Sequence, residues 1–78
     1  MKDYLYVLFN TLSKRYEGVM QFASDGMALH RLSSKVDRNE YELCRIGSID
    51  LSTGEVLPEA PVRLIWEKEE ILPKTQAE

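Results

Sequence analysis

The chain has 78 residues, 44% of them hydrophobic, and a formal net charge of −3, which predicts one domain with a modest core and leaves no room for a second domain. No apolar stretch approaches the roughly 20 residues that span a bilayer, and the N-terminus lacks the features of a signal peptide, so we expect a cytoplasmic protein with no membrane partner. The single cysteine, Cys44, cannot form an internal disulfide. The chain also has only one histidine, so it lacks the four cysteine and histidine ligands of an ordinary structural zinc site.

The charge is distributed unevenly along the chain. Residues 1–45 hold seven basic and six acidic side chains, whereas residues 46–78 hold three basic and seven acidic ones. An acidic chain repels phosphate at long range, so the strongly basic footprint of a tight nonspecific DNA binder is absent.

The first predicted strand covers residues 3–9, followed by a turn over 10–14. Successive side chains of a strand point to opposite faces, and here both faces carry apolar side chains, which is typical of a central strand. One face would carry Tyr4, Tyr6 and Leu8, and the other Leu5, Val7 and Phe9.

A second strand is predicted over residues 16–22. Tyr16, Met20 and Phe22 would share one side and Val19 the other. Gly18 either weakens this strand or marks a bulge.

A helix is predicted from Asp25 to Val36. Ser24 is a good N-cap, and Asp25 is favourable beside the positive end of the helix dipole. One apolar stripe should cover a sheet face, formed by Ala28, Leu29, Leu32 and Val36.

The run from Tyr41 to Gly54 couples a strand to a turn. Gly47 permits a bulge, and the segment from Asp50 to Gly54 pairs a side-chain acceptor with a residue that tolerates positive φ. The next strand should begin at residues 55–57.

Two prolines then interrupt the chain, Pro58 and Pro61, so only Val62 to Glu67 is predicted as a full strand, at an edge of the sheet. Residues 68–78 are charged and predicted to be a flexible tail, which bounds the domain at 1–67.

Together these elements predict an α+β fold, a four-stranded antiparallel sheet with one covering helix in the order β-β-α-β-β. One helix covers only one face of such a sheet. We therefore expect the other face to form a homodimer or to bind a partner.

The best candidate site is a basic stripe. Arg31, Lys35 and Arg38 are spaced i, i+4 and i+7, which puts them on one face if the helix continues that far. With Lys14 and Arg15 in the preceding turn and Tyr16 or Tyr41 nearby, the stripe would combine charge with a stacking surface, as in single-stranded nucleic-acid binders. The alternative is an ordinary solvated helix face.

Other candidates have simpler explanations. His30 could contact a base, although a lone histidine beside an apolar stripe is usually structural. Trp66 and the tyrosines could stack bases but are typical of a core. We find no nucleophile elbow, phosphate loop or metal-ligand pattern, so we expect no enzyme activity, catalytic residue, metal or cofactor.

The pattern Tyr-x-Leu-x-x-Ile-Gly-x-Ile-Asp-x-x-Thr-Gly over residues 41–54, with Gly26-Met27-Ala28-Leu29-His30 and Val36-Asp37 upstream, resembles the short nonstructural protein of gokushovirus-type microviruses. These are small single-stranded DNA phages that include the chlamydia phages. His30 replaces the family's usual arginine, and the linker between Asp37 and Glu40 is shorter than usual.

The resemblance implies a DNA-binding accessory protein that acts in genome replication and packaging in the host cytoplasm. The nucleic-acid-binding residues we predict are Lys14, Arg15, Tyr16, His30, Arg31, Lys35 and Arg38. The expected partners are single-stranded DNA and phage replication or procapsid proteins. The alternative is a protein-interaction module that recruits a replication or capsid protein without touching nucleic acid.

Overall fold

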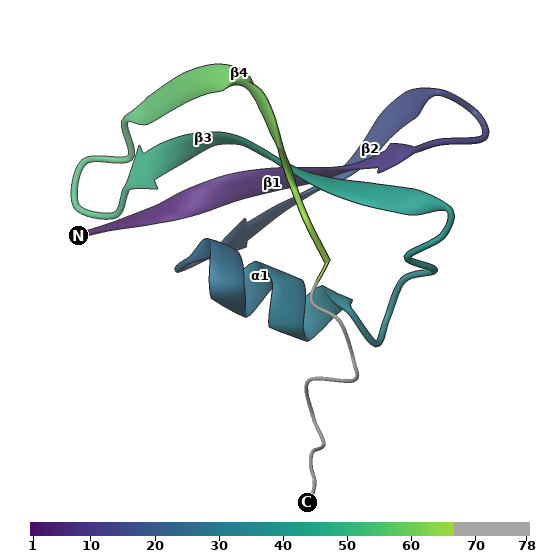
Figure 1. Ribbon diagram of the computed structural model, residues 1–78. Helices are drawn as coiled ribbons and strands as arrows, with labels where there is room; N and C mark the ends of the chain where they lie inside the picture. The colour runs from purple at the N-terminus through teal and green to yellow at the C-terminus, as the bar shows by residue number, and fades with distance from the viewer. Residues whose placement is uncertain (67–78) are drawn as a thin grey trace, which may run out of the picture.

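The computed structural model describes residues 1–66, which form one antiparallel sheet and one helix (Figure 1). In chain order the elements are β1 (Lys2–Asn10), β2 (Arg15–Phe22), α1 (Asp25–Leu32), β3 (Tyr41–Asp50) and β4 (Val56–Leu64). Across the sheet the order is β2-β1-β3-β4, with β1 and β3 central. The predicted α+β class, with four antiparallel strands and one helix, is confirmed.

The core lies between α1 and one face of the sheet. Tyr6, Ala28, Leu32 and Leu43 are buried there, and partly buried apolar side chains from β1, β2, α1 and β4, together with Trp66, surround them. The predicted face of β1 with Tyr4, Tyr6 and Leu8 is the one that packs on α1. The alternation of side chains along β1 therefore predicts correctly which residues share a face.

Helix α1 begins as the sequence predicts. The Ser24 hydroxyl accepts a hydrogen bond from the Met27 amide at 3.2 Å, which satisfies one of the free amides of the first turn. The helix ends at Leu32 and not at Val36, so the predicted C-terminal boundary is wrong. Two serines follow Leu32, and serine favours caps and turns because its hydroxyl bonds to nearby backbone. The Ser33 hydroxyl donates to the His30 carbonyl at 3.1 Å.

Strand β2 contains a bulge at Gly18, where φ is +73°. Tyr6 pairs with Met20 and Leu8 with Glu17, so two residues of β2 lie opposite Val7 alone. The extra residue reverses the alternation beyond it. Met20 and Phe22 face α1 as predicted, but Tyr16 lies on the opposite face beside Phe9, so its predicted placement is wrong.

Gly47 marks a second bulge, as predicted. The pairing of β1 with β3 shifts between Leu5 and Tyr6, which leaves Ile46 as the extra residue. A Cβ at position 47 would lie 2.6 Å from the carbonyl oxygen of Leu57. Only glycine therefore allows β3 and β4 to approach this closely here.

Strand β4 runs through both prolines, so the predicted strand from Val62 to Glu67 is wrong in extent. Its start at residue 56 and its edge position are confirmed. Pro58 pairs with Gly47 and Val62 with Arg45, so three residues bulge opposite Ile46. An edge strand tolerates proline because the amides on its outer side have no neighbouring strand to which they would donate hydrogen bonds. Glu67 and the predicted tail 68–78 lie outside the described residues.

The turn from Asp50 to Gly54 has the predicted chemistry. The Asp50 carboxylate accepts hydrogen bonds from the amides of Ser52 at 2.8 Å and Thr53 at 3.1 Å, and Gly54 adopts a φ of +79°. These hydrogen bonds favour the charged carboxylate, so they lower the pKa of Asp50.

The face of the sheet opposite α1 carries no second layer in the described part of the chain. Val7 and Cys44 lie at its centre, yet each is only 5% exposed. Cys44 is the buried strand residue that the sequence predicts, and desolvation raises the pKa of its thiol. Neighbouring side chains therefore cover the middle of this face within one molecule.

Candidate nucleic-acid interface

Asn10 shapes the turn between β1 and β2 that carries Lys14 and Arg15. The side-chain oxygen of Asn10 accepts hydrogen bonds from the amides of Leu12 at 2.9 Å and Ser13 at 3.1 Å. The Lys14 amide donates to the Asn10 carbonyl at 2.8 Å. Lys14 has a φ of +62°, the left-handed region that asparagine or glycine adopts more readily. This closed turn holds the backbone of Lys14 in a fixed position.

The segment between α1 and β3 packs against the same turn. The Glu40 carbonyl accepts hydrogen bonds from both the amide and the hydroxyl of Thr11, each at 2.9 Å. The Asn10 side chain also donates to the Glu40 carboxylate at 3.3 Å. The loop that follows the helix is thereby joined to the β1–β2 turn, at one end of the sheet (Figure 1).

Five basic residues belong to three separate segments, two of which, the β1–β2 turn and the loop after α1, are joined by the Thr11–Glu40 hydrogen bonds. They come from the β1–β2 turn and the start of β2, from the last turn of α1, and from the loop after α1. We call this set the basic end: Lys14, Arg15, Arg31, Lys35 and Arg38.

The basic end replaces the continuous helical stripe that the sequence predicts. Because α1 ends at Leu32, Arg31 belongs to the helix while Lys35 and Arg38 lie in the following loop. The spacing i, i+4, i+7 on one helix face is therefore wrong as a description of these three residues. His30 is exposed in the last turn of α1.

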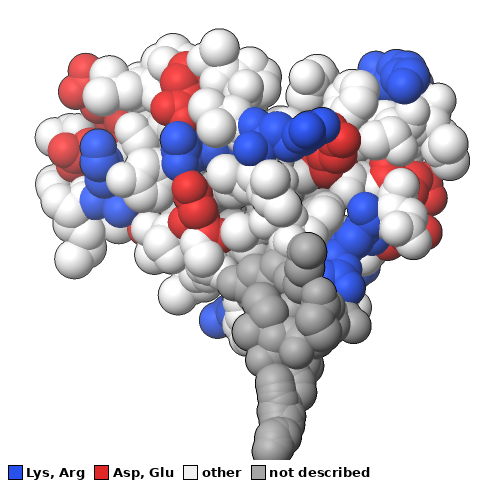
Figure 2. Space-filling model, in the orientation of Figure 1, with Lys and Arg blue, Asp and Glu red and all other residues white. Residues whose placement is uncertain are grey.

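Acidic residues reduce the net positive charge of the basic end. Glu17, Asp37 and Glu40 belong to the same segments, so five basic side chains are accompanied by three acidic ones. On the face of the described residues drawn in Figure 2, basic and acidic side chains are interspersed. The excess of positive charge is local, whereas the whole chain carries −3.

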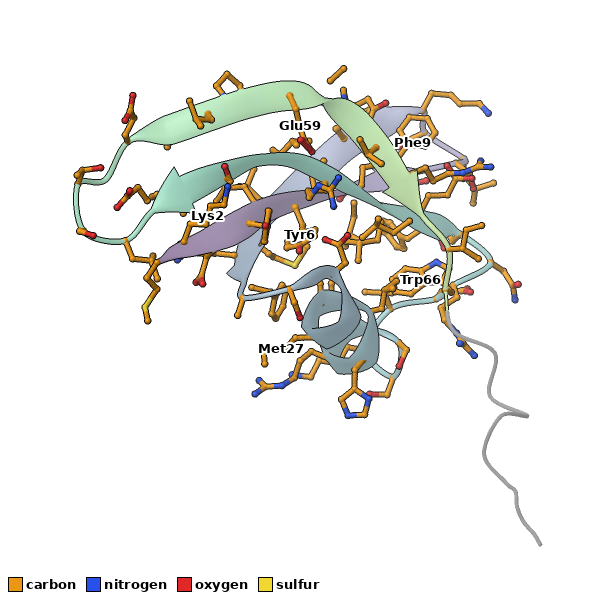
Figure 3. All side chains as sticks on the ribbon, turned by 60° about the vertical axis from the view of Figure 1, so that its left-hand side comes forward. Lys2, Tyr6, Phe9, Met27, Glu59 and Trp66 are labelled. Atoms are coloured by element: carbon orange, nitrogen blue, oxygen red, sulfur yellow. The ribbon has the colours of Figure 1, made fainter. Side chains whose placement is uncertain are left out.

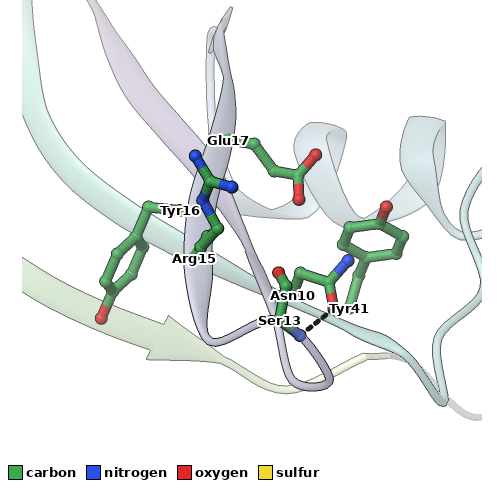
Figure 4. Close-up of a pocket in the computed structure, with 6 residues that line it drawn as sticks. All are labelled: Asn10, Ser13, Arg15, Tyr16, Glu17 and Tyr41. Carbon is green, nitrogen blue, oxygen red and sulfur yellow. Dashed lines mark hydrogen bonds between the residues drawn. The ribbon is translucent and has the colours of Figure 1, made fainter.

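A shallow depression of about 390 Å³ opens between the β1–β2 turn and the start of β3 (Figure 4). In the close-up, Glu17 and Tyr41 lie on the side of the sheet that carries α1, and Tyr16 points the other way. Arg15 and Tyr41 thus line the same depression, and Tyr41 is one of the two tyrosines expected near the basic residues. Its lining consists of Asn10, Ser13, Arg15, Tyr16, Glu17 and Tyr41.

Trp66 also belongs to this end. Its indole Nε1 donates a hydrogen bond to the Tyr41 carbonyl at 2.9 Å, and the side chain packs against the core between the sheet and α1 (Figure 3). The core assignment for Trp66 is confirmed. Its hydrogen bond fixes the start of β3 beside the depression.

Phe9 is a candidate that sequence reasoning missed. It lies on the side of the sheet away from α1 (Figure 3), next to Tyr16, with their ring centroids 4.8 Å apart and an interplanar angle of 49°. The signal in the sequence was Gly18, because a bulge there moves Tyr16 to the face of Phe9.

A polar network joins α1 to the sheet at the other end of the helix. The Tyr6 hydroxyl donates to one oxygen of Asp25 at 2.7 Å, and Arg45 donates to the other at 2.6 Å. Arg45 also donates to Glu59 at 2.7 Å. Desolvation, followed by the hydrogen bond to Asp25, raises the pKa of Tyr6. This network holds the helix against the sheet and is satisfied internally, so we assign it a structural role.

Within residues 1–66, no three histidine, cysteine, aspartate or glutamate side chains lie close enough together to hold a metal ion. The same residues contain no helix long and apolar enough to cross a membrane. Comparisons of the chain with protein-family models, curated proteins and solved structures find no match.

Proposed function

We propose that this protein is a noncatalytic accessory protein of a gokushovirus-type microvirus that binds DNA, the replication complex, or both, during genome replication and packaging in the host cytoplasm. The observation that carries the proposal is the basic end, whose five basic side chains come from three segments of an otherwise acidic molecule, two of them joined through Thr11 and Glu40. The sequence resemblance over residues 26–54 supports the viral assignment.

Binding at the basic end would be electrostatic and modest. Lys and Arg side chains contact phosphates and release counterions, and affinity falls linearly with the logarithm of salt concentration. The opposite end of the sheet carries Asp50 and Glu55 around the β3–β4 turn. Repulsion of phosphate from that end would orient the nucleic acid toward Lys14, Arg31 and Lys35.

The second candidate is a protein-interaction module, and edge strand β4 favours it. Val56, Leu57 and Val62 are exposed on this strand, and Ile65 follows it. An unpaired edge with exposed apolar side chains suits contact with a replication or procapsid protein, or with a second copy of the chain in a homodimer. Such apolar contacts survive high salt, whereas phosphate contacts weaken.

A pair of charge reversals tests the proposal. Lys35→Glu should weaken binding to a labelled oligonucleotide about tenfold and lower the salt slope by about 1, because it removes one phosphate contact. Lys2→Glu is the matched control, since it makes the same change of net charge at the other end of β1, on the order of 25 Å from Asn10 at the usual rise per residue. Fluorescence anisotropy measures both variants.

Equal weakening by Lys35→Glu and Lys2→Glu would show that only net charge matters and would refute the basic end as a site. Replacing Arg31, Lys35 and Arg38 together with glutamine should abolish retention of DNA without unfolding the domain. Retention of a phage protein by this triple variant in high salt would favour the protein-interaction module.

A further inference from the structure

Tyr16 is an exposed aromatic residue on a sheet face that the described chain does not cover. It is 56% exposed, whereas Tyr6, on the face toward α1, is fully buried. A role in the core therefore does not account for Tyr16. Exposed aromatic rings on an open sheet are typical platforms for unpaired bases.

The ring of Tyr16 has a fixed neighbour. Phe9 and Tyr16 are register partners on β1 and β2, and their rings lie 4.8 Å apart at 49°. A tilted pair of this kind limits the motion of the outer ring and leaves one of its faces open. Figure 4 shows Tyr16 directed away from Glu17 and Tyr41.

The Gly18 bulge is the reason that Tyr16 occupies this position. Without the extra residue, Tyr16 would share the face of Met20 and Phe22 and would add to the core. The bulge instead places the tyrosine beside Phe9. Bulges often serve to redirect a side chain at a functional site.

Two basic residues lie close to Tyr16 in the chain. Lys14 and Arg15 immediately precede Tyr16 in the chain. The one acidic residue paired with Phe9 across β1 and β3 is Glu42, and its carboxylate accepts a hydrogen bond from Arg63 at 3.1 Å. The surroundings of the ring are thus compatible with the phosphates of a bound strand.

We propose that Tyr16, supported by Phe9, stacks on a base of single-stranded DNA while the phosphates beside that base contact Lys14 and Arg15. This inference rests on the proposed DNA-binding function and adds the structural basis for a preference for unpaired DNA. Bases in a duplex are already stacked on both faces, so the ring selects unpaired DNA. Stacking tolerates any base, so the site reads no sequence.

The test compares two oligonucleotides of about 12 nucleotides, within the span of known single-strand sites. One is oligo-dT, and the other is an abasic deoxyribose-phosphate chain of the same length. Tyr16→Val keeps a strand-forming residue and should weaken binding of oligo-dT about 5- to 50-fold. Binding of the abasic chain and the salt slope should not change, because the phosphate contacts remain.

Tyr16→Phe is the matched variant, because it keeps a stacking ring and should bind oligo-dT as the wild type does. Circular dichroism and thermal unfolding establish that both variants fold. Equal affinity of Tyr16→Val and the wild type for oligo-dT would overturn the stacking site while leaving the proposed function intact. No binding of either oligonucleotide by the wild type would overturn both.

A second copy of the chain is the competing occupant of this face. Sedimentation velocity of the wild type and Tyr16→Val without DNA distinguishes it. If the substitution converts a dimer to a monomer and leaves the affinity for oligo-dT unchanged, the face is a self-association surface and the stacking proposal is wrong.

Discussion

At the scale of single residues, Gly47 shows most directly how a sequence position constrains the backbone. A Cβ there would meet the Leu57 carbonyl oxygen at 2.6 Å and the Pro58 Cα at 3.1 Å. Both are backbone atoms, so β3 and β4 would have to separate. We expect Gly47→Ala to lower the free energy of unfolding by about 1–3 kcal/mol, measured by urea denaturation.

Gly26→Ala is the control for that substitution. Gly26 lies in the first turn of α1, and a Cβ there would meet no atom within 4 Å. Alanine is the better helix former, so this variant should gain about 0.5–1 kcal/mol. Destabilisation of both variants by the same amount would contradict the close approach at Gly47.

The carboxylate of Asp50 should make the stability of the fold depend on pH in the acidic range. The pKa of Asp50 is lowered in the folded state by hydrogen bonds from the Ser52 and Thr53 amides. Its contribution to stability is therefore full above the unfolded pKa of about 3.9 and is lost as pH falls through the folded pKa. Asp50→Asn keeps an oxygen acceptor but does not titrate.

We therefore expect the unfolding free energy of Asp50→Asn to fall less than that of the wild type as pH is lowered below about 4. Chemical denaturation at a series of pH values measures the difference. Parallel curves for the two proteins would mean that the carboxylate of Asp50 is not specifically stabilised in the fold.

At the scale of elements, Arg45 connects the helix to two strands. Its guanidinium on β3 contacts Asp25 of α1 at 2.6 Å and Glu59 of β4 at 2.7 Å. Lysine has the same charge but no fork that can reach both carboxylates. Arg45→Lys should lower the free energy of unfolding by about 1 kcal/mol, measured by thermal and urea unfolding.

Arg63 provides the comparison for Arg45. Within residues 1–66 its one ion pair is with Glu42, at 3.1 Å, and its side chain is 65% exposed. Exposed pairs contribute little, so Arg63→Lys should change stability by less than about 0.5 kcal/mol. Equal changes in the free energy of unfolding for the two substitutions would contradict a larger contribution from the Arg45 bridge between α1 and β4.

The elements also show what the sequence could predict. Alternation in β1, the Ser24 cap and the turn from Asp50 to Gly54 are local signals, and each was read correctly. The end of α1 and the run of β4 through Pro58 and Pro61 depend on tertiary contacts. The prolines lie on an edge strand, and a bulge opposite Ile46 accommodates the chain around Pro61, which no local pattern reveals.

The candidate site was predictable in part. The residues of the basic end were all named from sequence, with Lys14 and Arg15 correctly expected in the turn, but Arg31, Lys35 and Arg38 were expected on one helix face. The loop after α1, which carries Lys35 and Arg38, is joined to the β1–β2 turn through Thr11 and Glu40. That contact spans 29 residues of sequence. Phe9 was missed because the bulge at Gly18, although foreseen as an alternative, was not followed to its effect on Tyr16.

At the scale of the whole molecule, the proposed function depends on a local excess of basic residues within a net acidic chain. A net acidic protein presents a basic end, built from three segments, beside an exposed aromatic pair. The interspersed charges of Figure 2 indicate weak, salt-sensitive binding rather than tight coating of DNA. This arrangement suits a protein that hands a genome from replication to packaging, because such a protein must also release it.

The most direct measurement is fluorescence anisotropy of labelled single-stranded and double-stranded oligonucleotides titrated with the wild-type protein at low and physiological salt. The account predicts saturable binding that weakens linearly with the logarithm of salt concentration and is tighter for the single strand. Absence of binding to both oligonucleotides at tens of micromolar protein in low salt would contradict it.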